Sequence, residues 1–211
     1  YNMQSFRHTA IAGTTLANNF CEDKSHRIWI ATSNAGLLLF NPSSNNFTSS
    51  SYQAWNPQSV HYASDIYQVI ADIDDNIWIA ADRGISYFNS SDNIIKNYFK
   101  NSPDKQFPDA LVTSFLKNSN GEIWTTTYGG GIAVCDSNLQ IIHTYVSGNS
   151  NMLPKVAGNE FWSLAEDASG NIWIGGQSGT LSIYNPHTKK FTNTSPSVFN
   201  NKTIRIMRTD A

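Results

Sequence analysis

The hydrophobic positions of this chain fall in short runs that are bounded by Gly, Asn, Asp and Ser. The runs are rich in β-branched and aromatic residues, as in Ile66–Ile70 and Leu111–Leu116, and this composition is typical of strands. The runs Ile28–Ile30 and Leu37–Phe40 are apolar at every position, so neither face of such a strand would meet water. We therefore expect an all-β protein in which the sheets are covered on both faces.

One motif occurs four times along the chain. An acidic or amide residue is followed six positions later by Trp, then by a Gly and another apolar strand. The tryptophans are 49, 46 and 49 residues apart, and a period of this length marks an array of identical supersecondary units. The motifs begin at Asp23, Asp72, Asn118 and Asp167, and their tryptophans are Trp29, Trp78, Trp124 and Trp173.

Each period has room for four short strands and no helix. A four-stranded antiparallel sheet that stacks between copies of itself is the blade of a β-propeller, so this is the fold that we predict. The four complete blades are expected at about residues 16–54, 64–100, 110–147 and 159–195. Residues 1–10 are expected to be the last strand of a preceding blade, and residues 201–211 the first strand of a following one. Residues 1–211 would then be part of a larger propeller, with seven blades as the expected total.

Composition and charge exclude several functional classes. Only 14% of the residues are charged, the net charge is −2, and there is no run of Lys or Arg of the kind that binds nucleic acid or an anionic membrane. No apolar stretch approaches the roughly 20 residues that span a bilayer, and no signal peptide opens the sequence. Cys21 and Cys135 lie two repeats apart, which argues against a disulfide between them.

The repeat resembles a known family. The pattern Asp-x-x-Gly-x-Ile-Trp-Ile-Gly, clearest from Asp167 to Pro186, is similar to the two-component regulator propeller repeat. The resemblance implies the periplasmic sensor region of a hybrid two-component system of gut bacteria. Such regions are followed by a membrane helix, a histidine kinase and a DNA-binding module, and many members sense oligosaccharides. The sequence departs from the pattern at His26 and Asp75 in place of the turn Gly, at Asn118 in place of Asp, and at 125–127.

The repeated residues are interpreted as structural. A Trp that recurs at one register between two apolar neighbours is expected to pack between blades, and its replacement by Ala should cost about 3–5 kcal/mol. The repeated Asp residues are expected to accept hydrogen bonds from turn amides. The five histidines lack metal-ligand spacing, and no carboxylate pair or nucleophile–base arrangement can be identified, so we expect no metal, no cofactor and no catalysis.

Function is expected where the repeats differ. The loops before each first strand and between each second and third strand should share one rim, and the position five residues before the repeated Asp should face the mouth of a central channel. At that position the sequence has Asn18, Tyr67, Thr113, Trp162 and Arg205. Aromatic faces beside Arg, Asn and Gln suit a sugar. The predicted ligand-binding residues are Trp55, Tyr67, Arg83, Tyr128, Trp162 and Arg205.

Three functional hypotheses follow. The first is a non-catalytic periplasmic propeller that senses an oligosaccharide or another small ligand. The second is a module for protein interaction or dimerisation, with ligand bound elsewhere. The third is a propeller enzyme, such as a lyase or a glycosidase. The expected partners are a ligand, further blades and domains of the same chain, and a second copy in a homodimer, because uncovered apolar faces drive association.

Overall fold

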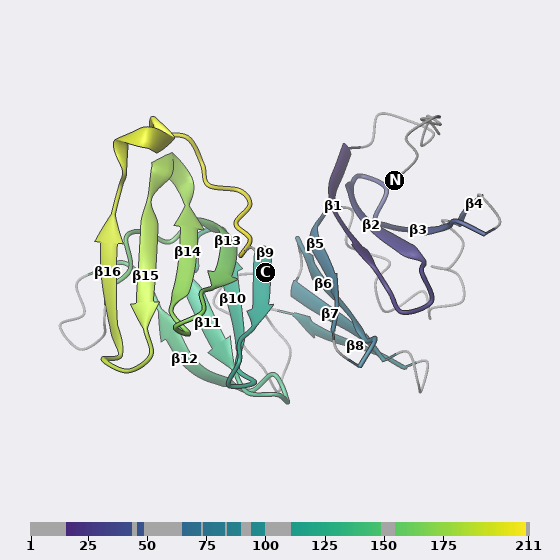
Figure 1. The fold of residues 1–211 in the computed structure, drawn as a ribbon, viewed down its shortest axis with the longest axis horizontal. Helices are drawn as coiled ribbons and strands as arrows, with labels where there is room; N and C mark the ends of the chain where they lie inside the picture. Colours follow the sequence, from purple (N-terminus) through teal and green to yellow (C-terminus); the bar gives the residue numbers. More distant parts are fainter. Residues whose placement is uncertain are drawn as a thin grey trace.

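The computed structural model describes residues 16–43, 46–48, 65–72, 74–82, 84–89, 94–99, 111–148 and 155–209. In this part of the chain the secondary structure consists of strands and two short 3-10 turns, η1 (Gln177–Gly179) and η2 (Ser197–Phe199). The strands form four antiparallel sheets of four strands each (Figure 1). The all-β prediction is therefore confirmed.

Each sheet is built from one repeat, in chain order from its innermost to its outermost strand. The strands are β1 (Leu16–Glu22), β2 (Ile28–Ser33), β3 (Leu37–Asn41), β4 (Asn46–Thr48), β5 (Ile66–Ala71), β6 (Ile77–Ala81), β7 (Gly84–Asn89), β8 (Ile94–Phe99), β9 (Val112–Lys117), β10 (Ile123–Thr127), β11 (Ile132–Cys135), β12 (Ile141–Tyr145), β13 (Phe161–Glu166), β14 (Ile172–Gly176), β15 (Leu181–Asn185) and β16 (Lys190–Thr194).

The sheets stack side by side around a common axis. Each innermost strand contacts the innermost strand of the next sheet, from β1 to β5, β5 to β9 and β9 to β13. This arrangement, in which the four strands of each sheet follow one another outward from the axis, is that of propeller blades. The predicted fold class is confirmed: four four-stranded antiparallel blades follow one another along the chain (Figure 1).

The hydrophobic core lies between sheets. Three clusters of buried side chains each combine residues from two neighbouring blades, as in the packing of Trp29 and Leu39 with Ile66 and Ile79. The first three repeated tryptophans belong to these clusters, and each contacts an aromatic ring of the following blade. The ring centroids are 6.2 Å apart for Trp29–Phe88, 6.0 Å for Trp78–Phe115 and 4.9 Å for Trp124–Tyr184.

Trp29, Trp78 and Trp124 are buried, which agrees with the predicted packing between blades. Trp173, in the last of the four sheets, is half-buried, because no further sheet covers it among the described residues.

Side chains also connect neighbouring innermost strands by hydrogen bonds. Asn19 Oδ1 accepts from the Val69 amide at 3.2 Å, and Gln68 Oε1 accepts from the Phe115 amide at 2.7 Å. Thr113 also reaches the following blade, but its side chain is the donor: Thr113 Oγ1 donates to a main-chain carbonyl of β13 at 2.6 Å. The contacts between blades are therefore both apolar and polar.

The structure describes only one of the two predicted terminal strands. Residues 1–10 lie outside the described residues. Residues 201–209 are described, and no strand is formed there. Ile204 nevertheless lies beside the last blade, because its amide donates to the Gly176 carbonyl at 3.0 Å and its carbonyl accepts from Ser163 Oγ at 2.8 Å. Cys21 and Cys135 are both free thiols, as expected from their separation along the chain.

Candidate functional site

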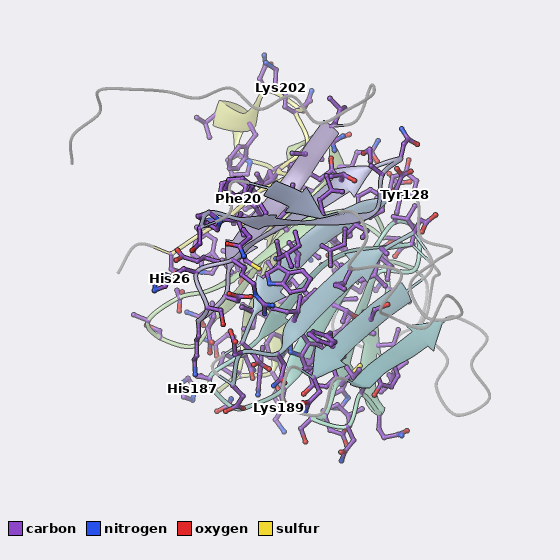
Figure 2. All side chains as sticks on the ribbon, turned by 90° about the vertical axis from the view of Figure 1, so that its right-hand side faces the viewer. Phe20, His26, Tyr128, His187, Lys189 and Lys202 are labelled. Atoms are coloured by element: carbon purple, nitrogen blue, oxygen red, sulfur yellow. The ribbon has the colours of Figure 1, made fainter. Side chains whose placement is uncertain are left out.

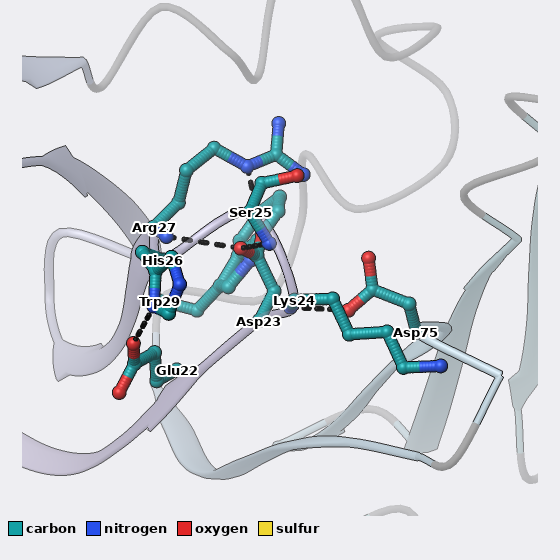
Figure 3. Close-up of polar contacts among 8 residues, drawn as sticks. All are labelled: Glu22, Asp23, Lys24, Ser25, His26, Arg27, Trp29 and Asp75. Atoms are coloured by element: carbon teal, nitrogen blue, oxygen red, sulfur yellow. Dashed lines mark hydrogen bonds and ion pairs between the residues drawn. The ribbon is translucent and has the colours of Figure 1, made fainter.

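The turn between β1 and β2 shows what the repeated Asp does (Figure 3). Asp23 Oδ1 accepts from the amides of Ser25 at 3.0 Å and Arg27 at 2.9 Å. Its other oxygen, Oδ2, accepts from Trp29 Nε1 at 2.8 Å and from Arg27 Nε at 2.7 Å. One carboxylate thus fixes the turn and the orientation of the buried indole. The sequence predicted the bonds to turn amides, but not the bond to Trp.

The second and fourth repeats use the same carboxylate–indole bond. Asp72 Oδ2 accepts from Trp78 Nε1 at 2.9 Å, and Asp167 Oδ2 accepts from Trp173 Nε1 at 2.8 Å. The indole hydrogen bond, together with those from Asn171 and turn amides, lowers the pKa of Asp167 to about 2. For Asp23 and Asp72, burial raises the pKa, but the hydrogen bonds outweigh it, and the net pKa lies below 3.8.

The third repeat carries the charge on a different residue. Asn118 stands where the others have Asp, and Trp124 Nε1 donates instead to Glu122 Oε2 at 3.2 Å. Asn118 Nδ2 donates to the same Glu122 oxygen at 2.9 Å. In the fourth repeat the two positions are reversed, with Asn171 Nδ2 donating to Asp167 Oδ2 at 3.0 Å. The amide and the carboxylate have exchanged places, and the hydrogen bond to the indole is kept.

The same turns require a left-handed backbone at one position. Gly121 and Gly170 have φ of 82° and 77°, and at the equivalent position His26 and Asp75 have φ of 60° and 64°. His26 and Asp75 therefore replace the turn Gly without a change of backbone shape. Both adopt a left-handed conformation, which is less favourable for a residue with a Cβ than for Gly.

A cavity of about 1080 Å³ lies along the axis and is lined by the innermost strands and by residues 205–209. Its lining includes all five residues at the variable inner position, Asn18, Tyr67, Thr113, Trp162 and Arg205. The two short side chains, those of Asn18 and Thr113, form hydrogen bonds to the next blade. Asn18 Nδ2 donates to the Ile66 carbonyl at 2.8 Å, and Thr113 Oγ1 donates to the Phe161 carbonyl at 2.6 Å.

The aromatic residues at this inner position contact each other instead. The rings of Tyr67 and Trp162 are 6.0 Å apart at 74°, and the rings of Tyr128 and Trp162 are 5.6 Å apart at 63°. The Arg205 guanidinium lies over the Trp162 ring, 4.6 Å from its centroid. We call these four residues (Tyr67, Tyr128, Trp162 and Arg205) the Trp162 cluster.

Tyr128 reaches the Trp162 cluster from the β10–β11 loop. Its amide donates to the Leu111 carbonyl at 3.1 Å, and it forms an isolated bridge with Glu160. Gly131 in the same loop has φ of 80°, and a Cβ there would overlap the Tyr145 carbonyl, so the loop needs glycine. Tyr128 is 41% exposed and lies at the edge of the molecule opposite to His187 and Lys189 (Figure 2).

Hydrogen bonds between the loops also agree with the predicted shared rim. The Asn34 amide, in the β2–β3 turn, donates to Asp65 Oδ1 at 3.0 Å, just before β5. The Gln177 amide, after β14, donates to the Glu160 carbonyl at 3.0 Å, just before β13. Loops of the two predicted kinds therefore meet at the ends where the innermost strands begin.

Of the six predicted ligand-binding residues, the structure brings four together in the Trp162 cluster. Trp55 and Arg83 lie outside the described residues. The charges near Tyr67 are mixed: burial and the carboxylates of Asp65 and Asp82 raise the pKa of its hydroxyl, while Arg205 lowers it. Sequence reasoning missed Glu122. It lies four residues after Asn118 and two before Trp124, in the one repeat that begins with an amide and not with Asp, and this position could have indicated a substitute carboxylate.

The described residues contain no group of three or more His, Cys, Asp or Glu side chains that could hold a metal ion. They also contain no helix that is long and apolar enough to cross a membrane.

The family model described as the two component regulator propeller matches residues 155–178, which include β13 and β14. The resemblance seen in the sequence is thereby confirmed in this repeat. No curated protein matches the chain.

Solved structures with the same fold include extracellular domains of signalling proteins. The chain is similar to that of the putative hybrid two component system BT3049 from B. thetaiotaomicron, with 25% identity and a TM-score of 0.68 over 90% of this chain and 24% of that chain. It is also similar to that of the putative hybrid two component system BT4673 from the same organism, with 18% identity and a TM-score of 0.68 over 86% of this chain and 25% of that chain.

A protein of unknown function from Bacteroides caccae shares 12% identity and has a TM-score of 0.60, over 90% of this chain and 64% of that one. The chain spans about a quarter of the two B. thetaiotaomicron domains. At 18% and 12% identity, the likeness shows the fold alone.

Proposed function

We propose that this chain is the ligand-sensing propeller region of a two-component signalling receptor, that it lies in the periplasm, and that it binds an oligosaccharide at the Trp162 cluster without catalysing a reaction. The signalling role and the location are supported by the match to the two component regulator propeller at residues 155–178 and by the likeness to extracellular domains of hybrid two component systems.

One observation carries the binding role. The rings of Tyr67 and Trp162 and the Arg205 guanidinium line a large axial cavity, and the Tyr128 ring packs against Trp162 beside it. The four side chains come from three different blades and from the segment after the last blade. Folding alone does not explain the gathering, because the equivalent residues Asn18 and Thr113 form hydrogen bonds between blades instead. Rigid aromatic faces beside hydrogen-bonding groups are what a sugar needs for stacking and orientation.

Calorimetric titration of the 211-residue chain with a broad panel of oligosaccharides tests the proposal. We expect saturable binding of at least one sugar and a loss of affinity of about 10- to 100-fold in Trp162→Ala, the size typical of a central aromatic contact. His187→Ala is the control, because it removes an exposed ring at the opposite edge (Figure 2). No binding across the panel, or turnover of a bound sugar, would contradict the proposal.

A second candidate, an interaction module, is favoured by one observation on β1. Leu16 and Phe20 are large apolar side chains with exposed fractions of 69% and 65%. Exposed apolar side chains of this size are common at interfaces between proteins. This candidate predicts that Phe20→Ser shifts the chain toward monomer in sedimentation experiments, whereas Trp162→Ala does not. An unchanged sedimentation profile in Phe20→Ser would remove the support for it.

A further inference from the structure

Among the described residues, two arginines lie over tryptophan rings, and their surroundings differ. The Arg27 guanidinium is 5.5 Å from the centroid of Trp29, and its Nε pairs with Asp23 Oδ2 at 2.7 Å. The Arg205 guanidinium is 4.6 Å from the centroid of Trp162. Within the described residues, no carboxylate lies at salt-bridge distance from Arg205. The Arg27 charge is neutralised by a partner from the same turn, whereas the described residues supply no such partner for Arg205.

The other charged residues of the cavity lining strengthen this contrast. Glu22 pairs with His26 at 2.5 Å, and Glu166 accepts from the amide and hydroxyl of Ser119 at 2.8 and 2.6 Å. Both lining glutamates are therefore engaged outside the cavity. Among the described lining residues, the cations are Arg205 and Arg208, and neither forms an ion pair. The Glu166 carboxylate forms no ion pair either, but both of its oxygens are already occupied by the hydrogen bonds from Ser119.

A guanidinium that stacks on an indole still has N–H groups along its edge. These donors match the two oxygens of a carboxylate or sulfate group, and such charge-assisted pairs are stronger than neutral hydrogen bonds. Arg205 is exposed and lines the cavity beside Tyr67 and Trp162, so an anionic group of a bound molecule could reach it while the rest of that molecule contacts the rings.

The carboxylates near Tyr67 limit which anion would fit. Asp65 and Asp82 raise the pKa of the Tyr67 hydroxyl and Arg205 lowers it, so charges of both signs act at this ring. The two carboxylates disfavour a small anion that is held by Arg205 alone. A hydroxyl-rich ring behaves differently, since its O–H groups donate to carboxylate oxygens.

We propose that the Trp162 cluster selects an acidic saccharide, in which a carboxylate or sulfate pairs with Arg205 and the sugar ring contacts the aromatic residues. This inference rests on the proposed function, because it names the class of ligand at the same site. It distinguishes acidic sugars from neutral sugars and also from simple anions.

The test begins with a glycan array that carries neutral, uronate-bearing and sulfated oligosaccharides, probed with the 211-residue chain. The best acidic binder is then compared, by calorimetry, with its chemically matched neutral form, in which the carboxylate is reduced to an alcohol or the sulfate is removed. We expect the acidic members to bind more tightly than the neutral ones, with at least a tenfold preference over the matched neutral form. Sodium acetate and sodium sulfate, at concentrations equal to the sugar, should not compete.

Substitutions then connect the preference to one residue. Arg205→Gln should weaken binding of the acidic sugar by about 10- to 100-fold, the range expected for one charge-assisted pair, and should weaken binding of the neutral form much less, so that the preference for the acidic form is lost. Arg205→Lys should have an intermediate effect, because it keeps the charge without the paired donors. Lys202→Gln is the matched control, since it removes one positive charge from an exposed side chain of the same segment (Figure 2).

The outcomes separate this inference from the proposed function. Equal binding of acidic and neutral forms, or acidic binding that survives Arg205→Gln, overturns the inference and leaves the sensor role standing. Equally tight binding of acetate or sulfate alone overturns the saccharide part. No binding of any glycan overturns both. Melting temperatures of all variants, measured alongside, identify any loss that comes from unfolding.

Discussion

The turns between the first and second strand of each blade and the Trp162 cluster lie at opposite ends of the innermost strands. The turns are nearly the same in every repeat, whereas the cluster is formed by residues that differ between repeats. At the turns, every repeat orients its Trp with a carboxylate, and when Asp is missing in the third repeat Glu122 takes over the bond. At the cluster, the same register holds a different residue in each repeat. Where the repeats agree, the side chains hold strands together; where they differ, the side chains either connect blades or face the cavity.

Replacement of a repeated Trp should have the largest effect on stability. Trp29 is 2% exposed and packs against the next blade, so Trp29→Ala should lower the free energy of unfolding by about 3–5 kcal/mol. Urea denaturation measures this, and Trp29→Phe should recover part of the loss. A cost below about 1 kcal/mol would mean that the repeated indoles are not essential to the contacts between blades.

Acidification should have the second-largest effect on stability, because it protonates three turn carboxylates together. The pKa values of Asp23, Asp72 and Asp167 lie below 3.8 in the folded chain, and that of Asp167 is about 2. Their contribution to stability is complete above the unfolded pKa of about 3.9 and is lost as the pH falls through the folded values. The urea midpoint should therefore fall between about pH 4 and pH 2. A flat profile over this range would contradict the assigned hydrogen bonds.

Removal of a single turn carboxylate should cost less. Asp72→Ala leaves the nearly buried Trp78 Nε1 and the turn amides of Asp74 and Asn76 without their acceptor, at an expected cost of about 2–3 kcal/mol. Chemical denaturation of the variant provides the value. If Asp74→Ala, in the same turn but with an exposed side chain, costs as much, the effect is not due to the carboxylate–indole bond.

The exchanged pair in the third repeat should show coupling between its two positions. Asn118→Asp alone places a second carboxylate beside Glu122, where an amide now donates at 2.9 Å, and should cost about 1–2 kcal/mol. The double substitution with Glu122→Asn recreates the arrangement of Asp167 and Asn171 and should recover most of that loss. Additive costs in the double-mutant cycle would show that the two positions act independently.

Trp162→Ala should have the smallest effect on stability, about 1 kcal/mol or less, because Trp162 is half-buried and belongs to none of the three core clusters. Unfolding experiments beside Trp29→Ala make the comparison direct. A cost near that of Trp29→Ala would show that the Trp162 cluster is a structural element, and it would weaken the binding role proposed for it.

Much of the fold could be predicted from the sequence, because the signals are local and repeated. The period of the Trp residues defines the blades, and the apolar runs define strands covered on both faces. The residues after Lys202 show the limit of this reasoning. Their sequence matches an innermost strand, but a strand needs a partner for its main chain, and in the described residues only Ile204 forms such hydrogen bonds with the last blade.

The register of the repeats predicted which residues belong to the candidate site, but it did not predict how their side chains are arranged. The inner position identified Tyr67, Trp162 and Arg205, but a register cannot show which side chains turn toward the cavity. Asn18 and Thr113 occupy the same register and reach carbonyls of the next blade, since their short polar side chains can form a hydrogen bond there. Glu122 was missed because its bond to Trp124 depends on the side-chain length of Glu, which compensates for the shifted position of the charge.

The hydrogen bonds from Asn19 to the Val69 amide and from Gln68 to the Phe115 amide have a consequence for solubility. Each innermost strand is the edge of its sheet, and an open edge is a template for strand addition by another chain. Because side chains of the preceding blade occupy these outward amides, the wall of the axial cavity resists that kind of self-association. A propeller of separate sheets can in this way border a central cavity with strand edges while some of their amides are already occupied.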